Sequence, residues 1–200
     1  IHVAATMIER GDGTAADVAE AVRWYERAAE KGTTDAMFRL GEMSLDGIGM
    51  GRDDGAAFKW FERGAKAGHP RSKAMLGYLY ETGRGTTASL MRAASLYAEA
   101  AAAYDARGKL LNAFVRMPMG ALSGQAEALA EEIYQAASLT SIRGEKEWML
   151  KYVQNNFTRI PPVVVMALHA RLKRGKQLVD LPGAPIEEVV LKSIERLIML

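Results

Sequence analysis

The side chains that most often carry catalysis or bind metals are few in this chain and lie far apart. The three histidines are His2, His69 and His169, and none belongs to a cluster with metal-ligand spacing. The absence of cysteine removes thiolate metal sites, disulfides and a cysteine nucleophile. The carboxylate pairs Glu131-Glu132 and Glu187-Glu188 are adjacent in sequence, so their side chains diverge around a helix. We therefore predict no catalytic residue, no metal site and no cofactor, and we expect the chain not to be an enzyme.

Two glycine-rich segments resemble phosphate-binding loops at first sight. They are Gly47-Ile48-Gly49, which is soon followed by Arg52, and Gly83-Arg84-Gly85. A phosphate loop follows a β-strand, whereas the residues before these segments have helical spacing. The same glycine spacing also recurs along the chain. We therefore interpret both segments as turns between helices, where glycine takes the left-handed conformation without steric cost.

The two turns belong to a 36-residue period that runs through the first hundred residues. Four features recur in register: a large apolar pair (Trp24-Tyr25, Trp60-Phe61, Leu96-Tyr97), a small pair (Ala28-Ala29, Gly64-Ala65, Ala100-Ala101), two turn glycines (Gly11 and Gly13, Gly47 and Gly49, Gly83 and Gly85) and a Leu-Gly pair (Leu40-Gly41, Leu76-Gly77). A period of about 20 to 50 residues is typical of stacked repeats, which bury their apolar faces against one another. The sequence therefore predicts a stack of repeats that presents surfaces instead of a catalytic pocket.

The middle copy, residues 33–68, predicts two helices joined by a glycine turn. Thr34-Asp35 supplies side-chain oxygens that can cap a helix start, and residues 36–45 have helical spacing. Asp53 is placed to cap a second helix over about residues 54–67, as are its equivalents Asp17 and Ser89. We expect the second helices to pack through small residues, with the aromatic side chains filling the gaps between them. Each repeat is then a helix pair, and the chain is an all-α solenoid.

These residues carry a resemblance to the Sel-1-like repeat (SLR), a relative of the tetratricopeptide repeat. The pattern is complete in the middle copy: Ala36, Leu40-Gly41, Gly47-Ile48-Gly49, Asp53, Ala56, Trp60-Phe61, Ala65 and Gly68. The first copy has Ala4-Ala5 in place of Leu-Gly, and the third has Leu96 for the Trp and Tyr104 for the closing Gly. The resemblance implies an adaptor or scaffold, which in bacteria is often tied to the cell envelope, secretion, signalling or host interaction. A cysteine-rich branch linked to β-lactam binding fits poorly, since the chain has no Cys.

The period predicts a division of the chain near residue 104. Residues 1–104 hold about three repeats (1–32, 33–68 and 69–104), and residues 105–200 form a degenerate repeat followed by a helical C-terminal cap. The expected last helix begins near Pro185 and has an apolar stripe that includes Val190 and Ile194. This stripe either covers the end of the stack or docks a partner. Because the first residues align with the interior of a repeat helix, we expect the chain to be a fragment of a longer protein.

Composition narrows the classes of partner. The 200 residues carry a net charge of +2, with basic and acidic residues interspersed, which argues against nucleic-acid binding dominated by a basic field. No apolar run reaches the roughly 18 residues that a transmembrane helix requires. The sequence leaves the compartment open between the bacterial periplasm and cytoplasm, and it leaves the oligomeric state open.

Candidate partner contacts fall in two groups. The first helices of such solenoids commonly line the concave surface, which makes Arg39, Glu42, Met43 and Tyr78 candidates. Met37, Met43 and Met75 are either core fillers or a pliable binding face. The second group is a basic cluster near the C-terminus: Arg171, Lys173, Arg174 and Lys176. These cations either complement the dipole at a helix end or bind an anionic partner such as an acidic protein segment, a polysaccharide or a phospholipid surface.

The sequence thus favours a protein-interaction scaffold whose concave surface holds a protein or peptide through a few anchor residues. The alternative is a cell-envelope factor that binds polysaccharide or peptidoglycan through exposed aromatic residues and the basic cluster. A hydrolase would require an acid, a base and a nucleophile that converge on one cleft, and the sequence supplies no visible set of this kind.

Overall fold

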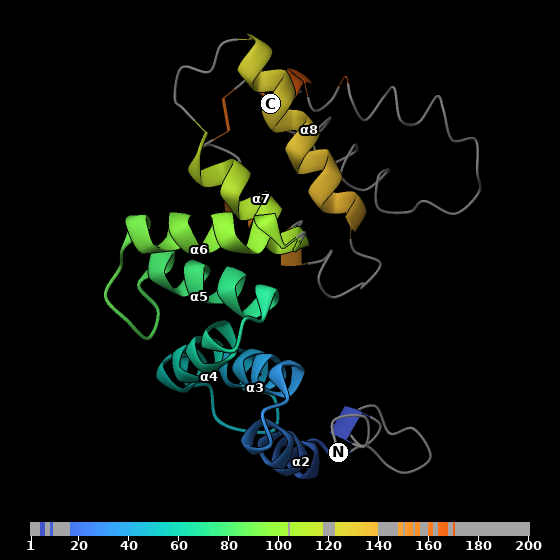
Figure 1. Cartoon of the computed structure of the whole chain (residues 1–200), viewed down its shortest axis with the longest axis vertical. Coiled ribbons are helices and arrows are strands. Elements are labelled where there is room, and N and C mark those ends of the chain that lie inside the picture. The colour runs from blue at the N-terminus through green and yellow to red at the C-terminus, as the bar shows by residue number, and fades with distance from the viewer. Residues whose placement is uncertain are drawn as a thin grey trace, which may run out of the picture. The chain divides into compact units, whose positions relative to one another are not determined.

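The structure is a computed structural model that describes residues 17–103, 105–117 and 123–139, with shorter stretches at 5–6, 9, 148–149, 151–153, 155–156, 160–161, 164–167 and 170. All regular secondary structure within these residues is α-helical, which confirms the predicted all-α class (Figure 1). The chain divides into two compact units, residues 1–108 and residues 109–200. None of the helices in the described part has the length and apolarity needed to cross a membrane.

The helices of the first unit start at the interval found in the sequence. The second helices of the repeats are α2 (Val18–Glu30), α4 (Asp54–Lys66) and α6 (Leu90–Ala102). The first helices α3 (Thr34–Asp46) and α5 (Pro70–Thr82) alternate with them, and α7 (Ala106–Val115) begins one interval after α5. Each helix from α2 to α6 packs against the next one along the chain, which makes a continuous α-solenoid (Figure 1).

The ends of these helices follow the capping chemistry of the sequence, with one exception. Asp17, Asp53 and Ser89 each cap a second helix by accepting a hydrogen bond from a backbone N–H of the first turn, as predicted. Gly47 ends α3 in the left-handed conformation with φ 73°. The prediction that Thr34-Asp35 caps α3 is wrong, because the helix already begins at Thr34. Thr33 is the N-cap residue, and its side chain makes no capping hydrogen bond.

The contact between a glycine and an aromatic ring sets the spacing of the helix pairs in the second and third repeats. A Cβ atom on Gly41 would lie 2.5 Å from the ring of Phe61, and one on Gly77 would lie 2.6 Å from the ring of Tyr97. Both rings are fully buried. Only glycine therefore lets the first helix approach the second helix so closely. This explains why the Leu-Gly pair recurs with an aromatic residue 20 positions later.

The residue before the buried ring has a different role from the one predicted. Trp24, Trp60 and Leu96 occupy equivalent environments, since all three are half-buried. Trp24 and Trp60 pack against the edge of the core but keep part of the indole exposed. The expectation that this residue fills the gap between helices is therefore correct only for its neighbour, which is Phe61 in the middle repeat.

Polar partners of the buried rings change together from repeat to repeat. The Tyr25 hydroxyl donates a hydrogen bond to Glu9 at 2.8 Å, and the Tyr97 hydroxyl donates one to Glu81 at 2.7 Å. Burial raises the pKa of Tyr25 to about 12, so its hydroxyl stays protonated and able to donate. The middle repeat has Phe61 and the buried Leu45 at the corresponding positions. A buried hydroxyl is thus kept where an acceptor faces it, and both are lost together.

A second pair varies in the same way where successive repeats meet. The Gly-x-Gly turn of a repeat lies against the first turn of the second helix of the preceding repeat. A Cβ on Gly49 would lie 2.7 Å from Val18, and one on Gly85 would collide with the Asp54 carbonyl. Arg84 forms two hydrogen bonds with the Asp54 carboxylate, at 2.7 and 2.9 Å, which lower the pKa of Asp54. The equivalent residues at the earlier junction are Ile48 and Val18, which are both apolar and partly buried.

The second unit is described only in parts. The helix α8 (Ser123–Leu139) buries Ala126, Leu129, Ala130, Ile133 and Ala136. Trp148 stacks on Tyr152 with ring centroids 5.5 Å apart. Tyr152 also meets Phe114 edge to face at 5.3 Å. The helix expected from Pro185 onward lies outside the described residues.

Replacing Gly41 with Ala should lower the free energy of unfolding by about 1–3 kcal/mol, because the added methyl group overlaps a ring packed in the core. Urea unfolding followed by circular dichroism measures the change. Gly51→Ala is the matched control, since a Cβ at that position meets no atom within 4 Å. Equal stability of the Gly41→Ala variant and the wild type would contradict the packing constraint.

Converting Glu81 and Tyr97 to the residues of the middle repeat should be less harmful together than separately. Glu81→Leu and Tyr97→Phe each remove one partner of the 2.7 Å hydrogen bond, whereas the double variant removes both. A double-mutant cycle in urea should therefore give a coupling free energy of about 1 kcal/mol. Additive effects of the two substitutions would show that the pair is not coupled.

Candidate partner-binding surface

The predicted contact residues of the first helices are engaged in ion pairs within the stack. Arg39 of α3 pairs with Glu9 and, at 3.2 Å, with Glu42. Arg107, at the start of α7, donates to the other oxygen of Glu42 at 3.0 Å. The exposed fractions of the side chains are 28% for Arg39, 18% for Glu42 and only 4% for Arg107. These carboxylates together raise the pKa of Arg39, which keeps its charge in spite of burial.

Two guanidinium groups make cation–π contacts with an aromatic ring beside this network. The guanidinium of Arg71 lies 4.3 Å from the centre of the buried Phe38 ring, and that of Arg107 lies 5.5 Å from it. The network therefore joins residues from the first helices of successive repeats, from Glu9 through α3 to α7. Arg107 reaches α3 across the intervening repeat. We conclude that these charges brace the first helices against one another.

Burial corrects another part of the prediction. Met43 has no exposed surface, and Met37 and Met75 are 3% and 1% exposed, so these side chains fill the core and cannot form a binding face. Spacing alone could not separate the two roles, since Met43 follows Leu40 by one helical turn. Tyr78 is half-buried, and its side chain is hydrogen-bonded to Arg84. The predicted basic residues Arg171, Lys173 and Arg174 lie outside the described residues, as do His2 and His169.

His69 has the structural role that its position before Pro70 indicates. It is the N-cap residue of α5, where its Nδ1 atom accepts a hydrogen bond from the Ser72 N–H at 3.3 Å. Its Nε2 atom faces Asp35 at 3.3 Å, and the side chain is only 10% exposed. Burial lowers the pKa of His69, and the nearby Asp35 carboxylate partly offsets this effect. No group of three histidine, aspartate or glutamate side chains in the described part of the chain is arranged to hold a metal ion.

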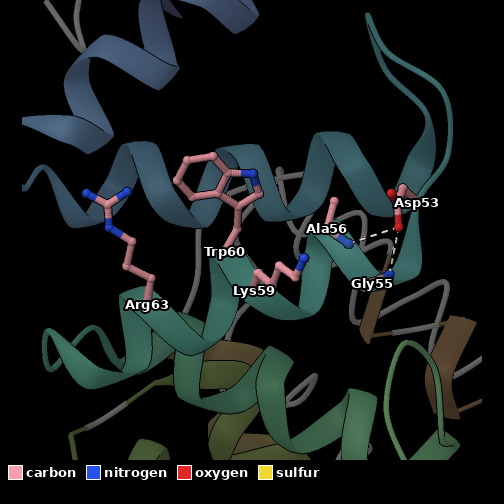
Figure 2. Close-up of a pocket in the computed structure, with 6 residues that line it drawn as sticks. All are labelled: Asp53, Gly55, Ala56, Lys59, Trp60 and Arg63. Atoms are coloured by element: carbon pink, nitrogen blue, oxygen red, sulfur yellow. Dashed lines mark hydrogen bonds between the residues drawn. The ribbon is translucent and has the colours of Figure 1, made fainter.

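The second helices, in contrast, line two open hollows, and we call the side of these helices that lines them the outer face. The first hollow, of about 420 Å³, is lined by residues of α4 and its cap: Asp53, Gly55, Ala56, Lys59, Trp60 and Arg63. Figure 2 shows Lys59, Trp60 and Arg63 on one side of α4 and Asp53 at the start of the helix, where its carboxylate accepts from Gly55 and Ala56. The indole and the two cations are therefore the groups that a ligand would meet.

A second hollow, of about 360 Å³, occupies the corresponding place in the next repeat. Its α6 residues are Arg92, Ser95, Leu96 and Glu99, which are the repeat equivalents of Ala56, Lys59, Trp60 and Arg63. Residues of α4 and α5 complete the lining, and Lys73 of α5 pairs with Glu99 at 2.7 Å. The hollow thus recurs with the period of the stack, and in the second one the acidic Glu99 takes the place of Arg63.

Comparisons with known proteins agree with the architecture. The Sel1 repeat family matches residues 2–33, 34–69 and 70–105. A crystal structure of a Sel1 repeat protein from Oxalobacter formigenes is 35% identical, with a TM-score of 0.53, over 56% of this chain and 84% of that one. A protective antigen present in uropathogenic Escherichia coli strains, which displays an SLR fold, is 19% identical with a TM-score of 0.60. That match covers 98% of this chain and 44% of the antigen, so the chain spans less than half of its length. A comparison with curated proteins found no match.

Acidification should destabilise the chain in part through His69. Because burial lowers its folded-state pKa below 6.5, the unfolded chain binds a proton more readily than the folded chain. The free energy that neutral His69 contributes to folding is fully present above pH 6.5 and is lost as the pH falls through the folded-state pKa. Urea unfolding at about pH 7 and pH 5 should show that acidification lowers the free energy of unfolding less for His69→Asn than for the wild type. Asn is chosen because it retains a capping side chain. An identical pH dependence in both proteins would contradict this assignment.

Proposed function

This chain belongs to the Sel1 repeat family, and from that premise we propose that it is a scaffold that binds another protein on the outer face of its second helices. Sel1 repeat proteins generally mediate protein–protein interaction, and scaffolds of this family are generally non-enzymatic. The observation that carries the proposal is the recurrence of a hollow at equivalent positions of α4 and α6. A surface that repeats along a stack suits an extended partner, which can contact several repeats at once.

The bracing of the first helices supports this choice of surface. Arg39 and Glu42 already satisfy each other, and reaching a partner would break ion pairs that are largely shielded from water. The second-helix face requires no such rearrangement, because Lys59 and Ser95 are exposed. A preformed surface also binds with a smaller loss of conformational entropy. We therefore assign Arg39, Glu42 and Tyr78 to the support of the stack.

The setting that we propose is a bacterial assembly in signalling, secretion or the cell envelope. Two similar solved structures come from bacteria, and one of them is described as a protective antigen. The alternative of polysaccharide or peptidoglycan binding depended on exposed aromatic residues and on the basic cluster at Arg171, Lys173 and Arg174. That cluster lies outside the described residues, and the partly exposed indoles of Trp24 and Trp60 do not by themselves favour a glycan over a protein.

Site-specific photocrosslinking in cells of the source organism tests the proposal. A benzoylphenylalanine residue at Lys59 or Ser95 should give a discrete adduct with a partner protein, which mass spectrometry of the adduct identifies. The matched control places the same group at Asp46, which is exposed at the end of a first helix. Adducts of equal yield from Asp46, or none from Lys59 and Ser95, would contradict binding on the second-helix face.

A further inference from the structure

Two neighbouring second helices carry the same basic and aromatic residues on their outer face. In α2 these are Arg23, Trp24 and Arg27, and their repeat equivalents in α4 are Lys59, Trp60 and Arg63. We propose that these six residues, the basic–aromatic strip, bind an acidic segment of a partner protein. The inference rests on the proposed function and adds to it the chemistry of the partner.

The geometry joins the two halves of the strip. Arg27 lies over the Trp24 ring at 5.3 Å from its centre, and Arg63 lies over the Trp60 ring at 5.6 Å. Arg63 also donates a hydrogen bond of 2.8 Å to the carbonyl oxygen of Ala29, near the end of α2. This bond ties the surface of α4 to α2, so the strip crosses from one repeat to the next.

The cations of the strip are among those that the described part of the stack leaves without an ion pair. Many cations in the described residues have a carboxylate within 3.4 Å, namely Arg39, Arg52, Lys66, Lys73, Arg84, Arg107 and Arg116. The four cations of the strip are exposed, and among the residues that the structure describes they form no ion pair. The equivalent positions in α6 are Ser95, Leu96 and Glu99, so the basic–aromatic pattern ends at α4.

The surroundings of the strip favour a spaced acidic segment over a uniformly charged polyanion. Glu20, Glu26 and Glu30 of α2 are exposed beside the strip, and Glu62 lies on α4. The Trp24 indole N–H donates to Glu20 at 3.3 Å. These carboxylates would repel a continuous row of phosphates or sulfates, whereas isolated carboxylates can lie between them. The partly exposed indoles can contact apolar side chains of the partner that lie between its carboxylates.

The alternation of cations and indoles also favours a particular spacing of the acidic residues. An extended chain advances about 3.3 Å per residue, so one acidic residue in every three places successive carboxylates about 10 Å apart. The two residues between them leave room for an apolar side chain that can contact an indole.

Fluorescence anisotropy with the full chain and a labelled synthetic peptide that repeats Glu-Ser-Leu tests the proposal. The double substitution Arg23→Glu and Lys59→Glu should weaken binding about tenfold or more, because it reverses two exposed charges. Lys151→Glu, an exposed position in the second unit, is the matched control and should bind like the wild type. Circular dichroism confirms that both variants are folded.

Three results would overturn the proposal: equal binding by the charge-reversed variant, equal binding of a Lys-Ser-Leu peptide, or tighter binding of heparin or single-stranded DNA than of the acidic peptide. These failures are distinct from failure of the proposed function. If the acidic peptide does not bind but the crosslink at Ser95 yields a partner, only the strip is wrong.

Discussion

The stack depends on the close approach that glycine permits between the two helices of a repeat. Where Gly41 and Gly77 lack a side chain, the rings of Phe61 and Tyr97 fill the space and are completely buried. The ring holds the second helix in one rotation about its axis. The residue before the ring is then fixed at the edge of the outer face, which is why Trp60 and Leu96 are only half-buried. A packing constraint in the core thus sets the positions of the surface residues.

The first and second helices differ in how their charged residues are used. The first helices α3 and α5 bury more residues than the second helices α4 and α6, and their charges are paired, as Glu42 is with Arg39 of the same helix and with Arg107 of α7. The second helices keep cations that no carboxylate in the described residues neutralises, such as Arg23 and Lys59. Charge that is paired inside the stack stabilises its geometry, and charge that is left outside is available to a partner.

Sequence periodicity located the helices well, because capping and glycine turns are local properties. The second helix expected over residues 54–67 runs from Asp54 to Lys66, and its predicted cap is Asp53. The role of Arg107 could not be predicted, since its contact with Glu42 depends on how small rotations accumulate over two repeats. The outer hollows were missed for a different reason. Trp60 was expected in the core, whereas its neighbour Phe61 fills that place, and only three-dimensional packing separates the two.

Both proposals place the partner on the second helices and not on the first. Chemical-shift mapping by nuclear magnetic resonance, with the isotope-labelled chain and the Glu-Ser-Leu peptide, locates the contact residue by residue. We expect the largest shifts on residues 23–27 and 59–63, including the indole N–H groups of Trp24 and Trp60. Largest shifts on Arg39, Glu42 and Tyr78 would place the partner on the first helices and rule out binding on the outer face.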